Sequence, residues 1–75
     1  MYETSHVVSA LERFCLDRNE TLEEREIRLK APSAPIKESL FKAGDRVLNR
    51  NLSLVLMHLE IEADDFLPYL ENATN

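Results

Sequence analysis

Three side chains in the sequence could bind a soft metal ion: His6, Cys15 and His58. A zinc site normally draws three or four ligands from short local spacings, such as two residues four apart on a helix. No pair among these three has that spacing. The sequence therefore predicts no metal site and no cofactor. It places His58 at the margin of an apolar helical face, with its ring partly buried.

Cys15 is also the candidate for a nucleophile or a redox switch, because it is the only cysteine. A reactive thiol needs an electropositive setting that stabilises the thiolate. On a helix its neighbours would be Leu11, Glu12, Arg18 and Asn19, a set of mixed charge. The spacing of Cys15 from the apolar residues around it instead predicts a buried and inert thiol.

Paired carboxylates are the remaining candidates for catalysis, and they occur at 23–24 and 64–65. Adjacent residues on a helix point in different directions, so neither pair converges on one point. Acid–base catalysis also needs a pocket that shifts pKa values, and a short helical chain offers little concave volume for a substrate. The sequence therefore predicts a protein that is not an enzyme.

The length of 75 residues allows one helical domain over 1–75, with frayed ends at 1–4 and 72–75. A domain of this size buries only about 60% of its unfolded surface and is marginally stable by itself. Disulfides, a metal or a partner chain usually compensate. One cysteine excludes an internal disulfide and no metal site is expected. The sequence therefore predicts a partner chain, in the first place a second copy.

Acidic residues outnumber basic ones by 14 to 9, which gives a net charge of -5. Binding to nucleic acid depends on Lys and Arg neutralising phosphates, so direct contact with nucleic acid is disfavoured. The first five residues lack the basic and apolar regions of a signal peptide. No run approaches the roughly 20 apolar residues that span a bilayer. A cytoplasmic protein without membrane contact is expected.

The elements that position these side chains are predicted to be helical, because no segment shows the sustained alternation of a strand. Thr21 and Glu24 form a capping box at the start of the second helix. Gly44 is expected as the C′ residue of the third helix, with a left-handed backbone, and Asn49 as the N-cap of the fourth. The expected elements are helices at 5–16, 22–30, 34–43 and 50–61, then a short final turn or two at 64–70.

The strongest pattern lies in the helix expected at 50–61. Its apolar residues form two neighbouring stripes, wider together than the arc of about 100° that a surface helix needs. One stripe is expected to close a helical hairpin against 34–43, and the other to face a second chain. Phe66, Leu67 and Leu70 could cover an end of the core, and Phe66 and Leu70 are also counted with the interface. The predicted hairpin core is Ile36, Leu40, Phe41, Leu52, Val55, Leu56 and Leu59. The predicted interface is Leu54, Met57, Ile61, Phe66 and Leu70.

Two stretches, 36–61 and 20–30, leave more than one function open. Residues 36–61 match a DNA-binding helix-turn-helix loosely, yet the second helix, at 52–59, is mostly Leu, Val and Met, where base contacts require polar and basic side chains. The stretch 20–30 is expected to be a solvated face, or else a docking surface for a basic partner. Direct DNA binding would require one basic face made by Lys30, Lys37, Lys42, Arg46 and Arg50.

One stretch, 44–58, resembles a family of small enterobacterial helical proteins, the biofilm-development and two-component connector proteins YmgB/AriR, with YcgZ as a relative. The family pattern is a helix ending in Gly-Asp, then Val, then Asn-Lys-Asn before an aliphatic helix. Upstream, the Leu-Glu-Glu at 22–24 is similar to the start of the family's first long helix. Two prolines, Pro32 and Pro35, depart from the pattern and predict a kink in that first arm. The matching residues are Gly44, Asp45, Val47, Asn49, Asn51, Leu54, Leu56 and His58, with Arg50 in place of Lys.

The resemblance implies a helical-hairpin homodimer with a regulatory role in biofilm formation, acid survival and two-component signalling, and without catalysis. It covers about the middle two-thirds of the chain. A likeness of the family to nucleoid-associated modulators keeps indirect gene regulation open. The sequence therefore predicts an all-α fold of short helices around a central helical hairpin, completed by homodimerisation. The predicted function is a regulator that binds an unidentified protein, with a DNA-binding regulator or a phage-type or antitoxin-type inhibitor as alternatives.

Overall fold

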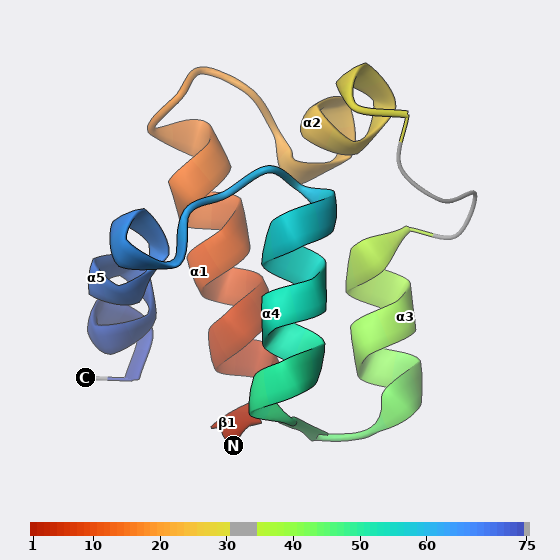
Figure 1. The fold of residues 1–75 in the computed structure, drawn as a ribbon, viewed down its shortest axis with the longest axis vertical. Coiled ribbons are helices and arrows are strands. Elements are labelled where there is room, and N and C mark those ends of the chain that lie inside the picture. The colour runs from red at the N-terminus through yellow and green to blue at the C-terminus, as the bar shows by residue number, and fades with distance from the viewer. Residues whose placement is uncertain (31–34, 75) are drawn as a thin grey trace.

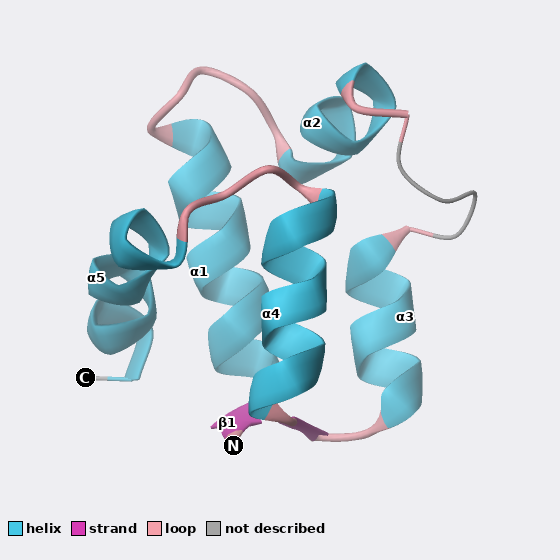
Figure 2. Cartoon of the chain, viewed as in Figure 1, coloured by secondary structure: helices cyan, strands magenta, loops and turns pink. Residues whose placement is uncertain are grey.

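The computed structural model describes residues 1–30 and 35–74. This part of the chain is mostly helical, as predicted, and forms five helices and one small antiparallel sheet (Figures 1 and 2). The predicted kink at Pro32 lies outside the described residues. In chain order the elements are β1 Tyr2–Glu3, α1 Thr4–Leu16, α2 Leu22–Arg28, α3 Ile36–Ala43, β2 Arg46–Val47, α4 Asn49–His58 and α5 Ala63–Thr74.

The sheet corrects the prediction that the chain contains no strand. β1 pairs with β2 in antiparallel register, Tyr2 opposite Val47 and Glu3 opposite Arg46. A strand of two residues is too short to show the alternation on which a prediction from sequence depends. The first residues, expected to fray, are therefore held by residues more than 40 positions away.

Further hydrogen bonds attach the N-terminus to the turn before α4. The Thr4 amide donates to the Asp45 carbonyl at 3.0 Å, and the Thr4 hydroxyl donates to the Gly44 carbonyl at 2.8 Å. The amino group of Met1 donates to Asn49 Oδ1 at 2.8 Å. Asn49 was predicted as the N-cap of α4, but it is the first residue of that helix and its side chain is used in this long-range contact instead.

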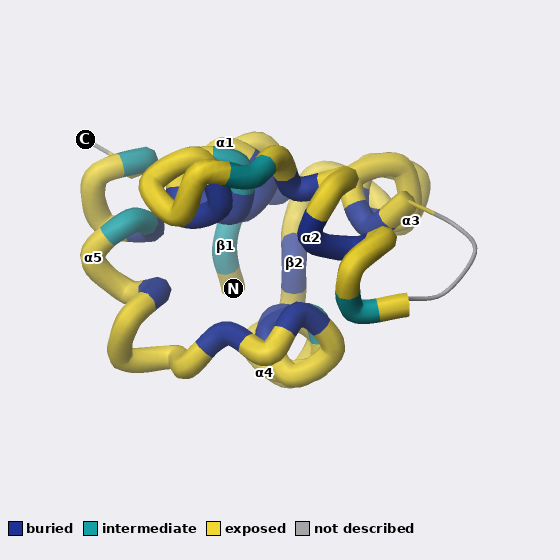
Figure 3. Tube along the Cα trace, turned by 90° about the horizontal axis from the view of Figure 1, so that it is seen from above, coloured by how far each residue is buried: buried dark blue, intermediate teal, exposed yellow. Residues whose placement is uncertain are grey.

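The central element of the described chain is α1, which packs most extensively against α5 and also contacts α2, α3 and the sheet. Viewed from above, α4 faces α1 across the core (Figure 3). This arrangement is possible because α1 is apolar over a wide arc. Its buried apolar side chains are Val7, Val8, Ala10, Leu11, Phe14 and Cys15.

The ends of α2 and α3 follow local signals. The predicted capping box is confirmed, since the Glu24 amide donates to Thr21 Oγ1 at 3.0 Å and the Thr21 amide donates to Glu24 Oε1 at 2.7 Å. The helix ends at Arg28, before Lys30, which has a φ of 54°. Gly44 follows α3 with a φ of 131°, so the predicted positive φ is confirmed, although its ψ of -170° is not that of a left-handed helix.

The C-terminal helix is longer than predicted. In place of a short turn or two at 64–70, α5 covers Ala63–Thr74 and includes residues 72–74 that were expected to fray. Packing against α1 supplies the stability that the local sequence does not predict, because the ring of Phe14 lies 6.4 Å from that of Phe66 and 5.3 Å from that of Tyr69. Phe66 and Leu70 are both buried there.

Candidate interaction surface

Helix α4 separates its apolar side chains onto two opposite sides. Leu52, Leu56 and the following Leu59 are buried in the core, and Val55 beside them is half-buried. On the other side Leu54 is 49% exposed and Met57 is 64% exposed. At 100° per residue, these two positions lie about 60° apart and one turn apart, so they form one exposed apolar strip.

Three other residues of the predicted interface are covered by the chain itself. Ile61, Phe66 and Leu70 are all buried in the core, so they are not available to a partner. The reason for Ile61 is that α4 ends at His58, before the predicted end at 61. For Phe66 and Leu70 the reason is the docking of α5 on α1. The predicted interface is thereby reduced to Leu54 and Met57.

The end of α4 is a Schellman motif, in which a residue with positive φ turns the chain. The Ile61 amide donates to the Leu56 carbonyl at 2.9 Å, and the Glu60 amide donates to the Met57 carbonyl at 3.1 Å. Glu60 occupies the turning position with a φ of 54°. This turn directs Ile61 inward and leaves Met57 on the outside.

The residues predicted to pack α3 against α4 also divide, and the predicted hairpin is not the centre of the fold, since α1 is. Ile36 and Leu40 are buried, but Phe41 is 48% exposed. Leu40 and Phe41 are adjacent and so point about 100° apart on the helix. Only one of them can face the core, and Leu40 does. His58, expected to be partly buried, is likewise exposed.

The two ends of the exposed strip differ in charge. Arg50 lies in the first turn of α4, on the side of Leu54 and Met57. It forms no salt bridge with any residue of 1–30 or 35–74. Beyond the other end lie Glu60, Glu62, Asp64 and Asp65, also without salt bridges in that part of the chain. We define the α4 face as Arg50, Ser53, Leu54, Met57, Glu60 and Glu62.

A shallow hollow lies beside the apolar strip, between the end of α4 and the start of α5. Its lining includes Ser53 and Ala63, whose small side chains leave room beside Met57. The carboxylate residues Glu60 and Glu62 also line it. An apolar side chain entering this hollow would therefore contact Met57 within an acidic surround.

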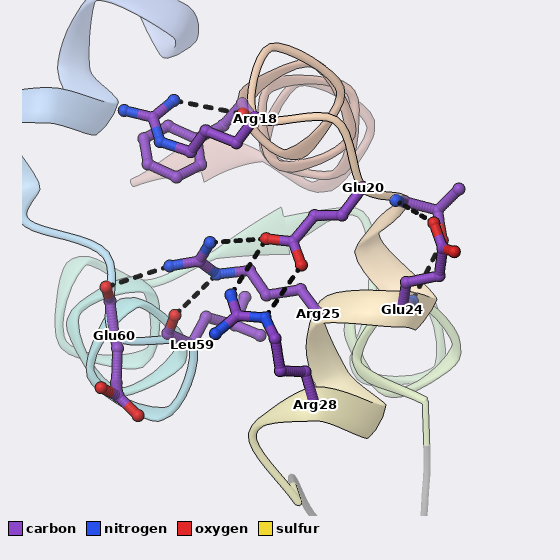
Figure 4. Close-up of polar contacts among 9 residues, drawn as sticks. Arg18, Glu20, Glu24, Arg25, Arg28, Leu59 and Glu60 are labelled. Carbon is purple, nitrogen blue, oxygen red and sulfur yellow. Dashed lines mark hydrogen bonds and ion pairs between the residues drawn. The ribbon is translucent and has the colours of Figure 1, made fainter.

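An ion-pair network centred on the buried Arg25 holds the acidic end of the α4 face in place (Figure 4). Arg25 of α2 donates to the carbonyls of Leu59 at 2.8 Å and Glu60 at 3.1 Å, and to Glu20 Oε2 at 2.8 Å. Arg28 donates to the same carboxylate at 3.1 Å. Its hydrogen bonds, with those of Arg25, hold the pKa of Glu20 below its ordinary value. The network attaches α2 to the turn that ends α4.

This network corrects in part the prediction that 20–30 is a solvated face, because Glu23, Glu24 and Arg28 are exposed but two charged residues are not. Arg25 and Glu26 are buried, and Glu26 Oε1 accepts a hydrogen bond of 2.8 Å from the Ile36 amide at the start of α3. The sequence did contain a signal for this burial, because the helical spacing of three and four places four residues on one face: Leu22, Arg25, Glu26 and Leu29. Two charged residues therefore share the face of two leucines, which marks them as candidates for buried structural groups.

The groups considered for chemistry lie apart from one another. Cys15 is fully buried, and burial raises the pKa of its thiol to about 11. His6 Nε2 lies 3.0 Å from Glu3 Oε2 in the first turn of α1. Within residues 1–30 and 35–74, no three potential metal ligands come together. In the same residues, no helix is long and apolar enough to cross a membrane.

Comparison with known proteins leaves the α4 face to be interpreted from its geometry. No protein-family model, curated protein or solved structure matches the chain. The α4 face, with its apolar strip and its unequal charged ends, is the surface on which the functional interpretation rests.

Proposed function

We propose that this chain is a small, non-enzymatic, cytoplasmic regulator that acts by binding protein, and that it first binds a second copy of itself through the α4 face. The observation that carries the proposal is the exposure of Leu54 and Met57 on successive turns of one helix. Contiguous exposed apolar surface is typical of a site of protein contact, and these two side chains adjoin. A partner would add buried surface to a domain of this size, which is only marginally stable by itself.

The titratable groups support binding in preference to catalysis. The shifted pKa values belong to Cys15, Glu20 and Arg28. Burial accounts for the first, and the ion pair between Glu20 and Arg28 accounts for the other two. None of the three residues lines the hollow beside α4. A catalytic site is expected to hold perturbed groups where a substrate can reach them.

The regulatory part of the proposal rests on the resemblance to the YmgB/AriR connector proteins. The residues that carry it, 44–58, include the turn at Gly44 and the whole of α4. A connector of this kind would alter a two-component phosphorelay, and through it biofilm formation or acid survival, by occupying a signalling protein. Its dimer would present two copies of each outer surface to that protein.

Direct DNA binding is the weaker candidate. Of the five basic residues that it would need on one face, Lys37 pairs with Glu12 at 3.2 Å and Arg46 pairs with Glu3 at 3.2 Å. Neutralised cations contribute little to phosphate binding. A shift of duplex DNA at low salt that disappears as salt is raised would favour this candidate over the connector.

Sedimentation equilibrium of the wild type and of Leu54→Glu tests the proposal, over about two decades of micromolar concentration. We expect a concentration-dependent dimer for the wild type and a folded monomer for Leu54→Glu, because a buried carboxylate is costly. Ile27→Glu is the matched control, since Ile27 is an exposed apolar residue on α2, and it should leave the dimer intact. A wild-type mass of one chain at every concentration would contradict the proposal.

A further inference from the structure

We infer that the second copy binds the α4 face in an antiparallel, two-fold arrangement, with Leu54 of each copy against Met57 of the other and Arg50 of each copy between Glu60 and Glu62 of the other. The inference rests on the proposed function and specifies its partner. It concerns the direction in which the two helices run, which the exposure of Leu54 and Met57 does not determine.

The distribution of charge decides between the two directions. The α4 face has Arg50 at one end, without a salt bridge to any residue of 1–30 or 35–74, and Glu60 and Glu62 at the other, followed by Asp64 and Asp65. A parallel pair would bring arginine against arginine and the carboxylates of both copies together. Like charges placed together across an interface are strongly unfavourable, whereas complementary ends also guide the encounter. The antiparallel pair places each charged end beside an end of opposite charge. The two helix dipoles then run in opposite directions, which is also favourable.

The spacing along the helix fits this arrangement. When Leu54 lies opposite Met57 of the other copy, the two-fold axis passes between positions 55 and 56. Arg50 then lies about 8 Å from the axis, because about 5.5 residues at 1.5 Å per residue separate the two along the helix. It extends past the end of α4 of the other copy, which is at His58. Glu60 and Glu62 follow in the turn beyond that end, so the charged contacts lie at the rim of the apolar centre.

Shape supports the same pairing. The hollow lined by Ser53, Met57 and Ala63 lies next to the strip, so it can accept Leu54 of the second copy. The two-fold axis repeats this contact, so each copy inserts its Leu54 into the hollow of the other. A standard interface buries about 800 Å² of each partner, about a sixth of the 5035 Å² surface of this chain. One face of a short helix buries less area than this, so the dimer is expected to be weak. Its charged contacts at the rim are expected to make it sensitive to salt.

Charge reversal tests the direction of the pair. Arg50→Glu and Glu60→Arg should each weaken the dimer about tenfold, because each turns two attractive contacts into repulsive ones. The double variant Arg50→Glu/Glu60→Arg should recover to within about threefold of the wild type, since in a two-fold dimer both copies of the contact reverse together. Lys42→Glu is the control, because it makes the same change of charge at an exposed position on α3 and should leave the dimer unchanged.

The outcomes separate this inference from the proposed function. If the wild type is dimeric and Leu54→Glu is monomeric, but the double variant is as weak as the single ones, the antiparallel pair is wrong and the α4 face stands. The same follows if Arg50→Glu has no more effect than Lys42→Glu. A wild-type chain that stays monomeric would contradict both the antiparallel pair and the proposed self-association. Circular dichroism of each variant verifies that these exposed substitutions leave the helices folded.

Discussion

Arg25 joins α2 to the end of α4, and its replacement by alanine is expected to destabilise the domain strongly. The substitution removes the donor of the buried Leu59 carbonyl and the ion pair with Glu20. An unsatisfied buried acceptor costs about 1–3 kcal/mol, and a broken buried ion pair about 3–5 kcal/mol. Arg28 still neutralises Glu20 and the Glu60 carbonyl can be hydrated, so we expect a loss of about 3 kcal/mol.

Arg28→Ala is the matched control, because Arg28 binds the same carboxylate but is much more exposed. The side chain of Arg28 is 55% exposed, against 10% for Arg25. An exposed ion pair contributes about 0–1 kcal/mol. A domain of 75 residues has a total stability of roughly 4–11 kcal/mol, so the two losses are easily distinguished.

Urea denaturation followed by circular dichroism measures both losses. The variants should be made in the Leu54→Glu background, because dimerisation would add a contribution that depends on concentration. Arg25→Met separates packing from hydrogen bonding, since it keeps the apolar stem but leaves the Leu59 carbonyl without its donor. If Arg25→Ala costs no more than Arg28→Ala, or if Arg25→Met is as stable as Leu54→Glu alone, the hydrogen bonds of Arg25 do not stabilise α4.

Three further predictions concern single groups. The Cys15 thiol, buried and with its pKa raised to about 11, should not react with a disulfide reagent at pH 8 until denaturant is added; rapid reaction in the native state would contradict its burial. Gly44→Ala should cost about 1–3 kcal/mol in urea denaturation through its φ of 131° alone, because nothing lies within 4 Å of the added Cβ. The lowered pKa of Glu20 means that its ion pair stabilises the fold fully above the unfolded pKa of about 4.3. This stability is lost as the pH falls through the folded pKa. The urea midpoint of Glu20→Gln should therefore fall less between pH 6 and pH 2 than the urea midpoint of the wild type.

Local signals allowed the helical elements to be predicted, and the predictions failed where contacts remote in sequence determine the structure. The apolar spacing of α1 and the capping box at Thr21 depend on residues within one or two turns, and both were predicted from the sequence. The pairing of Tyr2 with Val47 depends on contacts across most of the chain, and a strand of two residues gives no pattern. The length of α5 depends on its docking against Phe14. Interactions remote in sequence determined each of these, so no window of neighbouring residues could predict them.

The candidate surface shows how one turn changes an interface. The sequence places Leu54, Met57 and Ile61 on one stripe, as if the helix continued to 61. Glu60 interrupts it with a φ of 54°, although it is not a glycine, and Arg25 binds the carbonyls on either side of that turn. The apolar part of the α4 face therefore consists of Leu54 and Met57 alone, and Arg25 of α2 stabilises the turn that ends it. A strip so small would give little affinity and would not fix direction, so in the proposed dimer the charges of Arg50 and Glu60 supply the orientation.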